Sequence, residues 1–114
     1  MKLSPHALEI LQQRYLEPNQ TPEEKFGIVA KALASAEEND DKRRMLEEST
    51  FELMTSLKFL PNSPTLANAG RNAGTLSACF VLGIEDSRES IFEPLKIASH
   101  VKAFGGGGGY DFSS

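Results

Sequence analysis

The repeating apolar pattern of this chain changes at Pro61, and that change limits the folds the chain can form. Before Pro61, apolar side chains recur with the helical period of about 3.6 residues. After Pro61, the pattern predicts a short strand over residues 77–82, a helix over residues 87–104 and a second strand from Tyr110. The sequence therefore predicts a mainly α protein with a small β part.

The first two predicted helices have clear start signals. Ser4 before Pro5 supplies a favourable N-cap and a first-turn proline. Thr21 before Pro22 repeats this arrangement, and Glu24 completes a capping box with Thr21. A third helix is predicted over residues 42–58, and Pro61 ends the helical pattern shortly after it.

The apolar faces of these helices predict the core of the helical part. On the first helix the face consists of Leu8, Leu11 and Tyr15. The second helix presents an i, i+3, i+4, i+7 pattern made by Phe26, Val29, Ala30 and Leu33. From the third helix we expect four buried side chains: Leu46, Leu53, Met54 and Leu57.

The segment after Pro61 poses a packing problem. Residues 61–75 have loop composition, and residues 77–82 form an apolar run that predicts a buried strand. Parallel strands joined by one crossover helix need neighbours, because buried parallel sheets are covered on both faces. We therefore expect this chain to be incomplete or to depend on a partner.

Composition excludes several classes of protein. The net charge of −4 and the scattered basic residues argue against a nucleic-acid-binding protein. No apolar run approaches the roughly 18–20 residues that span a bilayer, and the N-terminus lacks the apolar core of a signal peptide. The single cysteine cannot form an internal disulfide. These features predict a cytoplasmic protein without a membrane segment.

The candidate functional residues also have ordinary structural interpretations. A lone cysteine in an apolar strand, such as Cys79, usually behaves as a small buried hydrophobe. The hydroxyls of Ser63 and Thr65 can form hydrogen bonds with the nearby backbone of a turn. Asp86-Ser87 can cap the following helix.

The glycine run at residues 105–109 lacks the Lys-Ser/Thr of a phosphate-binding loop and follows a helix, so a flexible linker is its simplest interpretation. His6 and His100 have no accompanying metal-ligand pattern, so no metal site is predicted.

Three separated segments occur in a specific order: NSPTLANAG at residues 62–70, LSACFV at residues 76–81 and GGGGGYDFS at residues 105–113. Together they resemble the start of the catalytic barrel of the large-chain ribonucleotide reductases, most closely the adenosylcobalamin-dependent class. The YDFS ending favours that class over the di-metal class, which shares much of this architecture. The resemblance implies a helical N-terminal domain over residues 1–60. It also implies the first strand–helix–strand of a ten-stranded α/β barrel over residues 61–114.

The resemblance implies an activity for the complete protein. It would reduce ribonucleotides to deoxyribonucleotides for DNA synthesis by thiyl-radical chemistry, with adenosylcobalamin as cofactor. Cys79 would be one half of a redox-active pair whose partner this chain lacks. The substrate would contact Ser63, Ala78, Cys79 and Gly107. We expect the isolated chain to be inactive and not to bind the cofactor by itself.

The resemblance further implies regulation and association. Asp86, Ser87 and Arg88 would bind an allosteric deoxynucleotide effector, and the helix over residues 87–104 would join copies of the chain in a homo-oligomer. Other expected partners are the ribonucleotide substrate and the remainder of the reductase chain. Two alternatives stay open. The chain could be a split or truncated interaction module that docks with a separately made remainder, or a small nucleotide-binding protein that uses the glycine loop alone.

Overall fold

The computed structural model describes residues 1–72 and 74–113, so residues 73 and 114 of the predicted loop and second domain lie outside the described part. Seven elements follow one another: α1 (Pro5–Arg14), α2 (Pro22–Ala34), α3 (Asp40–Thr55), α4 (Ser63–Asn68), β1 (Cys79–Gly83), α5 (Arg88–Ala103) and β2 (Gly107–Asp111). The fold is mainly helical with one small parallel sheet, which confirms the predicted class. None of the helices formed by the described residues is long and apolar enough to cross a membrane.

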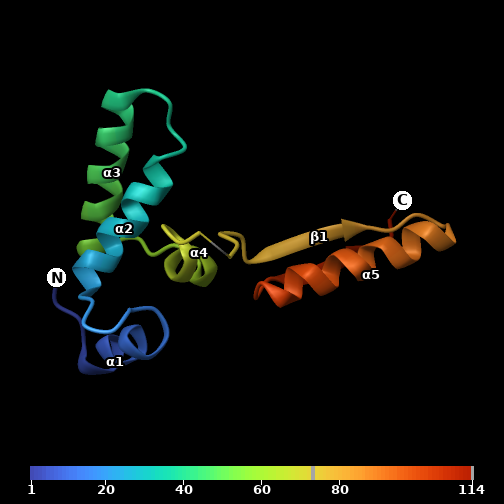
Figure 1. Cartoon of the computed structure of the whole chain (residues 1–114), viewed down its shortest axis with the longest axis horizontal. Coiled ribbons are helices and arrows are strands. Elements are labelled where there is room, and N and C mark those ends of the chain that lie inside the picture. The colour runs from blue at the N-terminus through green and yellow to red at the C-terminus, as the bar shows by residue number, and fades with distance from the viewer. Residues whose placement is uncertain (73, 114) are drawn as a thin grey trace.

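The molecule has an extended shape. Helices α1–α4 gather at one end, and β1 and α5 extend away from them side by side (Figure 1). The radius of gyration is 17.7 Å, whereas a compact chain of this length would have about 13 Å. We call the part formed by β1, α5 and β2 the arm.

The predicted start signals form the helix caps. Ser4 accepts a hydrogen bond from the Ala7 N–H. At α3 the cap is Asn39, which was not predicted, and the helix begins at Asp40 and not at residue 42. Thr21 and Glu24 form the complete capping box at α2. Hydrogen bonds from the backbone N–H and then the side chain of Thr21 hold the pKa of Glu24 below its usual value, because they stabilise the carboxylate.

The core of the helical part follows the predicted face of α2 more closely than that of α3. Its buried members come from α1, α2, α3 and the region of α4: Leu11, Phe26, Val29, Met54, Leu66 and Ala69. Of the four side chains predicted to be buried from the third helix, Met54 is buried, whereas Leu46, Leu53 and Leu57 are 43%, 43% and 54% exposed. Leu57 lies beyond the end of α3. Leu46 and Leu53 are exposed because α3 packs on α2 along a narrow line through Thr50 and Met54, so its other faces meet solvent.

Residues 61–75 were predicted as loop, but they include the short helix α4. Asn62 is its N-cap and accepts a hydrogen bond from the Thr65 N–H at 2.9 Å, while Pro64 lies in the first turn. Turn-forming residues are also helix-starting residues, and here Leu66 gives the segment an apolar side to bury. The prediction of a continuous loop was therefore wrong.

Lys25 connects α2 to α4. Its side chain is only 3% exposed, and its ammonium group donates to the Ala67 carbonyl oxygen at 3.1 Å. Burial lowers the pKa of Lys25 because desolvation disfavours the charged form.

The sheet of the arm consists of two parallel strands. Cys79 pairs with Gly107 and Leu82 pairs with Tyr110, with α5 as the crossover helix. The predicted buried strand is wrong, because side chains of β1 alternate between exposed and half-buried and Val81 is 77% exposed. Only α5 covers the sheet within the described residues, so the opposite face has no packing partner there.

The glycine run has two structural roles. Gly105 has a φ of 84°, and the N–H groups of Gly105 and Gly106 donate to the carbonyl oxygens of Lys102 and Val101, as in a Schellman cap. The strand then begins at Gly107, earlier than the predicted start at Tyr110. The interpretation of this run as a flexible linker is therefore wrong.

Gly70 offers a test of how tightly the segment after α4 is fixed. Its φ is +80°, and an added Cβ would lie 2.5 Å from Cγ2 of Ile28. We expect Gly70→Ala to lower the free energy of unfolding by about 1–3 kcal/mol, because it adds a clash to a left-handed backbone. Chemical denaturation of the purified chain measures this. Gly83→Ala is the matched control, since its Cβ meets nothing within 4 Å. Equal stability of the two variants would contradict the packing described here.

Candidate functional site

Three of the predicted substrate residues lie together where β1 and β2 begin. Cys79 and Gly107 are register partners, and the Gly107 N–H donates to the Ala78 carbonyl oxygen at 2.7 Å. A Cβ at Gly107 would be 3.7 Å from that same oxygen. Parallel pairing therefore brings Ala78, Cys79 and Gly107 into one small surface, although Cys79 and Gly107 are 28 residues apart in the sequence.

Cys79 does not behave as a buried hydrophobe. It lies at the start of β1 and is exposed. Exposure allows a thiol to react, whereas burial in apolar surroundings makes it inert. The structural interpretation of Cys79 as core packing is therefore wrong.

Ser63, the fourth predicted substrate residue, is the first residue of α4 and is exposed. Within residues 1–72 and 74–113, no hydrogen bond joins it directly to Ala78, Cys79 or Gly107. Its hydroxyl oxygen instead accepts a hydrogen bond from the hydroxyl of Tyr15 at 3.1 Å.

Two hydrogen bonds hold α4 against the segment that leads into β1. The hydroxyl of Thr65 donates to the Leu76 carbonyl oxygen at 2.7 Å, and the side-chain amide of Asn68 donates to the Thr75 carbonyl oxygen at 2.9 Å. Thr65 is only 6% exposed. The hydroxyl of Thr65 is therefore occupied in joining the two segments, and Ser63 is the hydroxyl of this helix that faces outward.

The predicted effector residues lie at the opposite end of β1 from Cys79. Ser87 caps α5 by accepting a hydrogen bond from the Ser90 N–H at 3.1 Å, as predicted. Asp86 precedes this cap and Arg88 is the first residue of α5. The structure thus places Asp86, Ser87 and Arg88 together but apart from the Cys79 surface.

The YDFS segment pairs with β1 through Tyr110 and Asp111, and its side chains also contact one another. The hydroxyl and backbone N–H of Ser113 donate to Asp111 at 2.6 and 2.9 Å. These two hydrogen bonds lower the pKa of Asp111 because they stabilise its carboxylate. The rings of Tyr110 and Phe112 lie 6.5 Å apart.

One hollow lies on the arm and another lies in the helical part. A groove of about 940 Å³ follows β1 and α5, and acidic side chains of Glu85, Glu89 and Glu93 are part of its lining. A second groove of about 450 Å³ lies among the helices and is mostly apolar. Tyr15 and Ser63 both belong to the lining of this second groove.

Comparison with known proteins decides the family. The sequence model described as "Ribonucleotide reductase, all-alpha domain" matches residues 1–74. The chain belongs to the ribonucleotide reductase family. The match covers α1–α4, outside which lie two of the three segments that carry the resemblance.

Several curated reductases resemble the chain. The vitamin B12-dependent ribonucleoside-diphosphate reductase of Mycobacterium tuberculosis (strain CDC 1551 / Oshkosh) is 41% identical over 99% of this chain and 18% of its own length. The enzyme of the same name from Thermoplasma acidophilum is 58% identical over 54% of this chain and 8% of its own length. The ribonucleoside-diphosphate reductase subunit alpha of Synechocystis sp. is 35% identical over 91% of this chain and 13% of its own length. The chain thus spans less than a fifth of each of these relatives.

Thr65 provides a test of the connection between α4 and β1. Thr65→Val keeps the side-chain volume but leaves the Leu76 carbonyl oxygen without its donor, so we expect a loss of about 1–2 kcal/mol in the free energy of unfolding. Thr65→Ser keeps the hydroxyl and removes one methyl group, which should cost at most about 0.8 kcal/mol. Denaturant titration of both variants measures the difference. A Thr65→Val chain as stable as the unchanged chain would show that this hydrogen bond holds nothing in place.

Proposed function

We propose that this chain forms part of a ribonucleotide reductase that converts ribonucleoside diphosphates to deoxyribonucleoside diphosphates. Membership of the family and the names of the similar reductases support the reaction and the diphosphate substrate. The observation that carries the proposal to this chain is the exposed Cys79 beside Ala78 and Gly107.

Each predicted substrate residue has a proposed role. Gly107 has no side chain, so a nucleotide can approach its backbone closely. The hydroxyl of Ser63 donates a hydrogen bond to a phosphate oxygen of the substrate without bringing a positive charge. Ala78 contacts the substrate through its backbone, next to the reactive thiol of Cys79.

Cys79 supplies reducing equivalents in this proposal. Its thiol and the thiol of a second cysteine together give up two electrons and two protons and form a disulfide. The ribose 2′-hydroxyl leaves as water and a hydrogen takes its place. A thiyl radical on a further cysteine begins the reaction by removing the 3′ hydrogen. Because the sequence contains one cysteine, both other cysteines belong to parts of the reductase that this chain does not contain.

The proposed cofactor of the complete enzyme is adenosylcobalamin, which generates the radical when it is bound. The names of the vitamin B12-dependent relatives support a cobalamin. No described residue is given a role in holding this cofactor, and we assign cobalamin binding to the remainder of the reductase.

We assign the arm to the first strand–helix–strand of a ten-stranded α/β barrel, with residues 1–60 as a helical domain and residues 61–114 as the start of the barrel. Bare apolar surface supports this assignment, because Val81, Phe92 and Phe112 are 77%, 67% and 73% exposed. Further strands and helices of the reductase would cover that surface. The same surface favours docking of a separately made remainder as the second candidate function.

Regulation is proposed at the far end of β1. There Asp86 can accept hydrogen bonds from a ribose hydroxyl, and the N-terminus of α5 next to Ser87 and Arg88 favours a phosphate. A deoxynucleotide effector fits this combination. Ile91 and Leu95 on α5 are 43% and 52% exposed, which supports pairing of two copies of the chain along this helix.

The proposed redox role predicts the behaviour of Cys79→Ser in the full-length reductase. A serine hydroxyl cannot form the disulfide, so multiple turnover should fall to background. The replacement is close in size and Cys79 lies beside the proposed polar substrate, so the melting temperature should stay close to that of the unchanged enzyme. Deoxynucleotide yield and melting temperature are measured on the same preparation loaded with cofactor.

Ser77→Ala is the control for this prediction, since Ser77 is an exposed neighbour of Cys79 with no proposed role. We expect its turnover to match that of the unchanged enzyme. A Cys79→Ser enzyme that keeps normal multiple turnover would contradict the redox role.

A further inference from the structure

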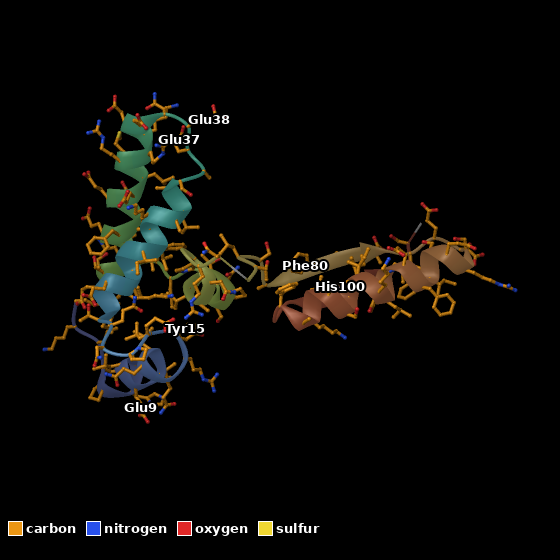
Figure 2. All side chains as sticks on the ribbon, viewed as in Figure 1. Glu9, Tyr15, Glu37, Glu38, Phe80 and His100 are labelled. Carbon is orange, nitrogen blue, oxygen red and sulfur yellow. The ribbon has the colours of Figure 1, made fainter. Side chains whose placement is uncertain are left out.

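The hydroxyl of Tyr15 reaches Ser63 across 48 residues of sequence. Tyr15 is the C-cap residue of α1, and its ring packs against the core cluster that includes Leu11 and Phe26. Figure 2 shows Tyr15 between α1 and α4. The ring is thus held in the apolar groove while its hydroxyl reaches the groove's edge, where Ser63 begins α4.

The direction of this hydrogen bond determines what Ser63 can do. The two hydroxyl oxygens lie 3.1 Å apart. A phenol is a stronger hydrogen-bond donor than an aliphatic hydroxyl, so the favoured direction has Tyr15 as donor and the Ser63 oxygen as acceptor. A serine has one proton to donate and can accept as well. When Ser63 accepts from Tyr15, its own proton stays available for an outside acceptor.

We propose that Tyr15 is a positioning residue that orients the Ser63 hydroxyl so that its proton points toward a phosphate oxygen of the nucleotide. The proposal rests on the proposed function, in which Ser63 contacts the substrate. A phosphate oxygen has no proton to give to Ser63, so Ser63 must donate. Tyr15 stabilises the single hydroxyl orientation in which Ser63 does so, before the nucleotide arrives.

A purely structural role for Tyr15 makes a different prediction. The same parts of the chain are joined a second time by an ion pair between Glu17, just after α1, and Arg71, just after α4. If Tyr15 only fastens α1 to α4, removal of the Glu17–Arg71 pair should have similar effects on nucleotide binding. Glu17→Gln is therefore the matched control for Tyr15→Phe, which removes the hydroxyl and keeps the ring.

The test compares two ligands on the full-length reductase. Equilibrium dissociation constants are measured for a ribonucleoside diphosphate and for the nucleoside with the same base. The Kd of the nucleoside divided by the Kd of the diphosphate isolates the contribution of the phosphates to binding. Because loss of a phosphate contact raises only the Kd of the diphosphate, we expect Ser63→Ala to reduce this ratio about tenfold and Tyr15→Phe to reduce it about fivefold. Glu17→Gln should leave the ratio unchanged, and all the variants should bind the nucleoside like the unchanged enzyme.

The double variant Tyr15→Phe with Ser63→Ala completes a double-mutant cycle. Its ratio of the two dissociation constants should equal that of Ser63→Ala alone, because Tyr15 acts only through the Ser63 hydroxyl. Full additivity, an unchanged ratio in Tyr15→Phe, or equal effects of Tyr15→Phe and Glu17→Gln would each overturn the positioning role. If Ser63→Ala itself leaves the ratio unchanged, the substrate contact in the proposed function fails, and the role of Tyr15 fails with it.

Discussion

The arrangement of the site depends on how α4 is held between the helical part and the arm. On one side, the buried ammonium group of Lys25 donates to the Ala67 carbonyl oxygen. On the other, Thr65 and Asn68 donate to the carbonyl oxygens of Leu76 and Thr75, a few residues before Cys79. Backbone groups that would otherwise lack partners are thereby satisfied, and Ser63 and Cys79 are held in a common framework.

The second constraint is the incomplete cover of the parallel sheet. Two strands and one helix bury little, and the outer face of β1 exposes Val81. An isolated unit of this kind gains little from the hydrophobic effect, which is the main force that stabilises parallel sheets. The proposed barrel resolves this, because additional strands would bury the bare face and bring further cysteines toward Cys79.

Local signals in the sequence predicted local structure well. The caps at Ser4, Thr21 and Ser87 have the predicted partners, and the strand–helix–strand order follows the pattern after Pro61. The exposure of side chains could not be predicted from local signals. Leu46 and Leu53 are apolar residues of the kind found in cores, but no other helix or strand covers them. The helix α4 was hidden because residues that start turns also start helices.

At the candidate site, too, local signals and tertiary packing contribute differently. Motif resemblance selected Ala78, Cys79 and Gly107, and strand pairing places them together. The contact between Tyr15 and Ser63 had no sequence signal, because periodicity assigned Tyr15 only to the apolar face of α1. Contacts across 48 residues arise from packing of whole helices, which a local pattern does not encode.

The oxidation state of Cys79 after one turnover tests the proposed chemistry most directly. The reduced full-length enzyme with its cofactor is freed of external reductant and given a ribonucleoside diphosphate. Its free thiols are then labelled, and the labelled peptides are identified by mass spectrometry. We predict that labelling of Cys79 falls in proportion to the deoxynucleotide formed, that Cys79 appears in a disulfide-linked peptide, and that added reductant restores the label. Full labelling of Cys79 in enzyme that has made a stoichiometric amount of deoxynucleotide would contradict its role as a reductant.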